Sequence, residues 1–94
     1  MLTVTKEAAT LLKAAKAAEG ASDDAGIRIQ TAIISARDKT IAIRLAVADE
    51  PGPGDQAIEQ QGLRIFVEGA LIDTLADRTL DVRDAHERVE LVFR

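Results

Sequence analysis

The sequence has 94 residues, a formal net charge of −4, 2% aromatic residues and no cysteine. Its positive residues are scattered singly, so it lacks the basic face or stacking rings that nucleic-acid binding requires. No apolar run approaches the roughly 20 residues of a membrane span. The missing thiols exclude disulfides, thiol nucleophiles, cysteine-type zinc sites and sulfur-ligated clusters built from these residues alone. We expect a cytoplasmic single domain over residues 1–94, with no cofactor and no membrane or nucleic-acid partner.

The N-terminal part predicts a short extended segment followed by one long helix. Thr5 is a suitable N-cap because its hydroxyl can accept a free amide of the first turn. Residues 6–19 are rich in alanine, the best helix former, and Gly20 is suited to the left-handed conformation that ends a helix. Apolar residues recur at helical spacing and predict the buried face: Ala8, Leu11, Leu12, Ala15 and Ala18.

The rest of the chain is dominated by strand patterns with period two. Residues 27–33 and 41–47 alternate apolar and polar side chains and predict two long strands. The segment 49–55 holds both prolines and predicts a rigid turn. Further elements follow in order: a hairpin of residues 56–60 and 63–67 around Gln61-Gly62, a short helix at 70–76, and a closing hairpin of 79–83 and 88–93 with its turn at 84–87.

Antiparallel pairs joined by short turns, with one long helix packed on them, predict a mainly β fold (α+β by helix content). The expected architecture is a β-sandwich or pseudobarrel of about seven strands, with a long N-terminal helix and a short second helix. No serine elbow or glycine-rich phosphate loop is present, so nothing in the sequence indicates an enzyme.

Several phrases in this order resemble the HesB/IscA-like family, the A-type iron–sulfur cluster carriers. They are Leu2-Thr3-Val4-Thr5, Gly26-Ile27-Arg28-Ile29, Asp49-Glu50-Pro51, Gly62-Leu63-Arg64-Ile65-Phe66-Val67, Leu75-Ala76-Asp77 and Leu80-Asp81-Val82. The resemblance covers nearly the whole chain. It implies a single HesB-like domain of the family's β pseudobarrel type.

The resemblance also implies where the family's cluster ligands would fall. The family uses three cysteines: the first would lie near Ala36, Arg37 or Asp38, and a Cys-Gly-Cys pair would lie beyond Arg94, the last residue given. No thiol occupies the first position, so we expect a divergent member that cannot bind a cluster through its own thiols. The sequence therefore predicts a non-catalytic accessory or regulatory protein-interaction domain. The resemblance implies iron–sulfur assembly proteins as partners, and homo-oligomerisation.

The charged loop at the former cluster position is the candidate interaction site: Ser35, Ala36, Arg37, Asp38 and Lys39. One alternative is a small-molecule or hard-metal site in the pocket between sheet and helix, with oxygen donors such as Asp38, Asp55 or Glu68. A second alternative is a structural homodimer whose sheet edges pair. His86, the only histidine, is expected in a solvated turn rather than in a metal site.

Overall fold

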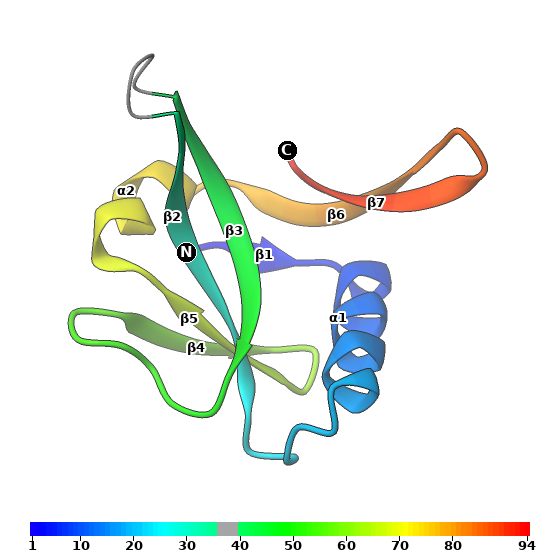
Figure 1. Ribbon diagram of the computed structural model, residues 1–94, viewed down its shortest axis with the longest axis horizontal. Helices are drawn as coiled ribbons and strands as arrows, with labels where there is room; N and C mark the ends of the chain where they lie inside the picture. The colour runs from blue at the N-terminus through cyan, green and yellow to red at the C-terminus, as the bar shows by residue number, and fades with distance from the viewer. Residues whose placement is uncertain (36–39) are drawn as a thin grey trace.

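The computed structural model describes residues 1–35 and 40–94, and it has the predicted order of elements (Figure 1). The seven strands and the helical segments of this described part are, in chain order, β1 (Thr3–Val4), α1 (Lys6–Ala18), β2 (Gly26–Ser35), β3 (Thr40–Ala48), β4 (Gln56–Gln60), β5 (Leu63–Val67), the 3-10 turn η1 (Gly69–Leu71), α2 (Ile72–Leu75), β6 (Thr79–Ala85) and β7 (Arg88–Phe93). The predicted central hairpin is confirmed to the residue.

The strands form two sheets. One has the order β3-β2-β5-β4, and the other has the order β1-β6-β7. The hairpins are antiparallel, but β2 pairs with β5 and β1 with β6 in parallel, which the sequence pattern did not predict. In the described residues the two sheets are not joined by strand pairing, so the fold is a sandwich without a closed pseudobarrel.

Helix α1 begins and ends where its local chemistry predicts. The Thr5 hydroxyl accepts a hydrogen bond from the Ala8 amide at 3.2 Å, and Gly20 has a φ of 69°. The buried face, however, consists of Ala8, Ala9 and Leu12, whereas Leu11 is 38% exposed. The predicted stripe was therefore wrong at Leu11, Ala15 and Ala18, which are exposed. An alanine-rich helix has two weakly apolar faces, and only packing decides between them. In the described part of the chain, no helix has the length and apolar character needed to cross a membrane.

The core lies between the two sheets and α1. Among the described strands, β1, β2, β5 and β6 contribute fully buried apolar residues to it. Its members are Leu2, Val4, Ala8, Ala9, Leu12, Ile27, Ile29, Leu63, Ile65, Val67, Leu71, Leu75 and Leu80. On β3 the alternation predicted for the strand is confirmed at Ile43, Leu45 and Val47, which pack against this core while half-buried. Both long strands therefore use one face for burial.

Two hairpin turns have left-handed backbone at both central residues. Gln61 and Gly62 have φ values of 54° and 72°, and His86 and Glu87 have values of 50° and 66°. Two-residue turns with positive φ match the twist of the strands that they join. The last turn is therefore tighter than the predicted 84–87, since β6 extends to Ala85.

Gly26 opens β2 at a point of close approach. A Cβ atom there would lie 2.7 Å from the Arg64 carbonyl oxygen and 2.9 Å from the Phe66 ring. Phe66 is itself fully buried, and the Arg64 guanidinium stacks over it at 5.1 Å from the ring centroid. Only glycine leaves room for this contact between β2 and β5.

Candidate functional site

The charged loop at the former cluster position lies largely outside the described residues. Ala36, Arg37, Asp38 and Lys39 are not described, and Ser35 is described only as the last residue of β2, where it pairs with Thr40. The candidate interaction loop therefore stays a prediction.

Asp55, one of the predicted oxygen donors, belongs to an enclosed ion pair. Its side chain has no exposed surface, and its two oxygens accept hydrogen bonds from Arg28 Nε at 2.8 Å and Arg28 Nη2 at 3.1 Å. The Gly52 amide donates a further bond at 2.7 Å. The bond from Arg28 is the main reason why the pKa of Asp55 lies below its ordinary value, and the Asp55 carboxylate in turn raises the pKa of Arg28.

This ion pair fixes the proline-glycine turn to the sheet. Arg28 also donates a hydrogen bond to Gln30 on the same strand, so its guanidinium is held on both sides. A Cβ at Gly52 would lie 2.9 Å from Arg28 Nη2, which explains why a glycine packs there. The arrangement links the turn to β2, because Asp55 accepts two hydrogen bonds from Arg28 and one from the Gly52 amide of its own turn.

Glu68, a second predicted donor, is likewise engaged. Its carboxylate accepts from the Thr31 amide at 2.6 Å and from the Thr31 hydroxyl at 3.2 Å, while its own amide donates to the Ile29 carbonyl at 2.9 Å. It thereby ties the end of β5 to β2. Among the described residues, no group of three or more histidine, cysteine, aspartate or glutamate side chains could hold a metal ion.

These contacts do not favour the hard-metal alternative. A hard cation needs several free oxygens that converge on one point. The carboxylate oxygens of Asp55 and Glu68 instead accept hydrogen bonds from Arg28 and Thr31. Asp38, the third predicted donor, lies outside the described residues. His86 is exposed at the tip of the β6–β7 hairpin, as a solvated turn predicts.

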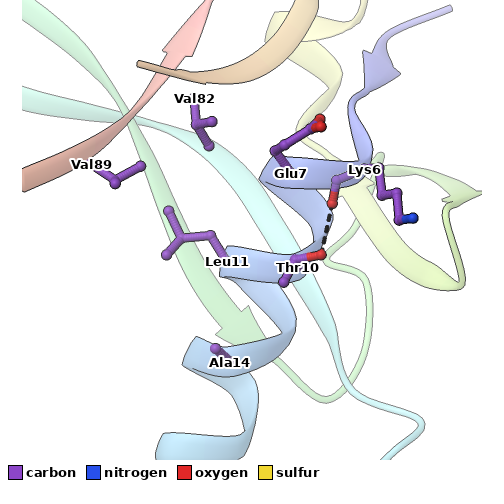
Figure 2. Close-up of a pocket in the computed structure, with 7 residues that line it drawn as sticks. All are labelled: Lys6, Glu7, Thr10, Leu11, Ala14, Val82 and Val89. Carbon is purple, nitrogen blue, oxygen red and sulfur yellow. Dashed lines mark hydrogen bonds between the residues drawn. The ribbon is translucent and has the colours of Figure 1, made fainter. Parts of the chain in front are cut away.

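An exposed apolar groove lies between α1 and the β6–β7 hairpin (Figure 2). It has a volume of about 480 Å³. Val82 and Val89 point from the hairpin towards the helix face that carries Leu11 and Ala14, and Val89 is 51% exposed. The polar residues of the groove lie on the first turns of α1: Lys6, Glu7 and Thr10.

The groove exists because one face of the hairpin is apolar and extends past the core as far as Val89. Pairing places Leu80 opposite Phe93, Val82 opposite Leu91 and Asp84 opposite Val89, from the core outwards. The other face is polar and holds ion pairs such as Arg83–Glu90 at 3.2 Å. Sequence reasoning missed the groove because Leu11 was expected in the core. The apolar strand pattern reaching Val89 was the available signal.

The comparisons with known proteins bear on the fold. No family model matches the sequence, and no curated protein matches it. Among solved structures, the chain is similar to IscA crystallised with the [2Fe-2S] cluster, with 20% identity over 100% of this chain and 81% of that one and a TM-score of 0.74. It is also similar to Escherichia coli SufA, which is involved in biosynthesis of iron–sulfur clusters, with 18% identity over 99% and 78% of the two chains and a TM-score of 0.73.

The donor set of this chain does not fit an iron–sulfur cluster. Cluster iron is bound by thiolates, or by imidazole at some sites, and the 94 residues contain no cysteine and one histidine. The architecture, in contrast, matches over the full length of this chain, with a TM-score of 0.74. The chain therefore has the HesB/IscA-like fold of the A-type iron–sulfur carriers.

Proposed function

We propose that this chain is a non-catalytic accessory or regulatory domain in iron–sulfur cluster biosynthesis, acting through contact with other proteins over residues 1–94. The observation that carries the proposal is the likeness of this chain, over its whole length, to cluster-bound IscA and to SufA, which is involved in cluster biosynthesis, although this chain has no cysteine. A scaffold without soft donors cannot hold a cluster by its own thiols, but it keeps the surfaces that its backbone shape creates.

The described polar residues support a role without catalysis. The Asp55 carboxylate, which has no exposed surface, is hydrogen-bonded to Arg28 and Gly52, and the Glu68 carboxylate is hydrogen-bonded to Thr31. A general acid or base needs a proton-transfer position open to substrate, and these groups point at their partners instead. Their contacts stabilise the fold by joining the turn and the end of β5 to β2.

The expected partners are iron–sulfur assembly proteins, and the expected location is the cytoplasm, both inferred from the sequence and the fold likeness. The test is affinity purification of the tagged chain from its native cells under anaerobic conditions, followed by mass spectrometry. Selective enrichment of a cluster-assembly or iron-handling protein is the expected result. Retention of none of them would count against the proposal.

A second measurement tests the absence of a cargo. After anaerobic incubation with iron and sulfide and removal of small molecules, we expect the visible spectrum to lack cluster bands, whereas IscA treated in parallel is the positive control. Stable bands would show that ligands from outside these residues complete a cluster site. Elemental analysis of the gently purified protein separates this proposal from the hard-metal alternative, which requires a stoichiometric metal.

A further inference from the structure

Strand β3 is an edge strand with an open hydrogen-bonding side. It lies at the end of the order β3-β2-β5-β4, and within the described ranges it pairs with β2 alone. Pairing with β2 is continuous from Ala42 to Ala48, and the two strands run side by side along this length (Figure 1). The amides and carbonyls on the opposite side of Ala42–Ala48 therefore form a row that an extended segment can complete.

This edge lacks the features with which proteins usually block strand addition. Such features are prolines, lysines, bulges and short length. Between Ala42 and Ala48 there is no proline or lysine, and the only charged residue is Arg44. The one register shift of the β2–β3 pair lies elsewhere, between Ile33 and Ser35. The edge is long, regular and nearly uncharged.

Arg44 is the one feature that can select a partner. It is exposed on the face of β3 turned away from the core, and in the described part of the chain it forms no ion pair. Its cross-strand neighbour is Gln30, a neutral residue. The Asp55 carboxylate is already bound to Arg28. As far as residues 1–35 and 40–94 show, the guanidinium of Arg44 therefore remains available to a group on an added strand.

The position of Arg44 argues against a second copy of this chain as the occupant. A two-fold antiparallel pairing that overlaps all of Ala42–Ala48 sets Arg44 of each copy opposite Ala46 of the other, so the two Arg44 side chains lie on a diagonal of one face. Like charges in such positions are about 5 to 8 Å apart and destabilise the pair. The net charge of −4 on each copy adds repulsion.

We propose that the edge of β3 at Ala42–Ala48 binds an extended segment of a partner protein that places a carboxylate side chain opposite Arg44. Main-chain hydrogen bonds to the open edge supply the affinity, and the ion pair sets the register and selects acidic segments. This inference deepens the proposed function, on which it rests, by naming the surface and the chemistry of the partner.

The test is a titration of the isotope-labelled protein, followed by amide chemical shifts, with a synthetic peptide of about nine residues that alternates valine and threonine around a central glutamate. A matched peptide has lysine at the centre. We expect shifts confined to the amides of Ala42–Ala48 and their neighbours on β2, and about 2- to 5-fold tighter binding of the glutamate peptide. The variant Arg44→Glu should reverse this preference, and its circular dichroism should match that of the parent because Arg44 is exposed.

A third peptide tests the backbone contribution: the glutamate peptide methylated on its central amides should not bind, because it cannot donate to the edge. Shifts located elsewhere, equal binding of both peptides, or undiminished binding of the methylated peptide would overturn the assignment. Self-association that Arg44→Glu changes would instead identify a second copy as the occupant and also overturn it. This titration contains no assembly protein, so its outcome is independent of the purification experiment. Failure of the titration would overturn the assignment of the β3 edge but not the proposed function.

Discussion

Replacement of Asp55 by Asn should weaken the fold more than any other single carboxylate change that the described contacts suggest. The substitution keeps the volume of a fully enclosed side chain but removes its charge, and it sets an amide donor against the Arg28 guanidinium. Three hydrogen bonds of 2.7 to 3.1 Å depend on the carboxylate. Loss of charge-assisted hydrogen bonds between this carboxylate and a guanidinium that is 27% exposed, and so stays partly solvated, costs about 1 to 3 kcal/mol.

The pH dependence distinguishes the loss of an ion pair from a general packing defect. Because the pKa of Asp55 is lowered by its bond from Arg28, its ionised form stabilises the folded state above the ordinary carboxyl pKa of about 3.9. This contribution is lost as the pH falls through the lower folded-state pKa. The difference in free energy of unfolding between the parent and Asp55→Asn should therefore be largest at pH 7 and should decrease between about pH 5 and pH 3.

Urea unfolding followed by far-UV circular dichroism measures this difference, since the chain has no tryptophan or tyrosine for fluorescence. Asp73→Asn is the matched control, because Asp73 is exposed on α2 and should change the free energy of unfolding by less than about 0.5 kcal/mol. Equal stability of the two variants at pH 7, or a gap that does not depend on pH, would refute the role assigned to the ion pair.

Three further predictions concern packing. Gly26→Ala should cost more than about 2 kcal/mol and lower the thermal midpoint, because its Cβ would lie 2.7 Å from the Arg64 carbonyl oxygen; a variant as stable as the parent would contradict this close approach. On α1, Leu12→Ala should cost about 2 to 4 kcal/mol in urea unfolding, while Leu11→Ala should cost much less, because Leu12 is 4% exposed and Leu11 38%; equal losses would place both in the core. Gln60→Ala should increase hydrogen exchange of the β1 amides, because the Gln60 side chain bonds the β1 backbone at both a donor and an acceptor; unchanged exchange would show that β1 is held by β6 alone.

Much of the fold could be predicted because its signals are local. Thr5 caps α1 through an amide three residues away, and the Gln61-Gly62 turn needs only the positive φ values that its own residues adopt. The bounds of β4 and β5 follow directly from that turn. The absence of cysteine is a property of the sequence, and it decides which cargo these residues cannot bind without any reference to shape.

Contacts between distant segments could not be predicted in the same way. Arg28 and Asp55 are 27 residues apart, and nothing in the sequence indicates that they form an ion pair. The hard-metal alternative rested on treating Asp55 and Glu68 as free donors, which the Arg28 and Thr31 contacts correct. The parallel pairings of β1 with β6 and β2 with β5 likewise join segments that no turn connects.

The sequence by itself determined the order of elements, the turns and the lack of soft ligands, because each depends on the chemistry of neighbouring residues. The tertiary structure alone decided which face of α1 is buried, which carboxylates are occupied and which strand, β3, is left at an open edge. The physical reason is that periodicity identifies an apolar face but not the surface that will cover it. Burial and pairing are settled only when segments distant along the chain compete for the same core.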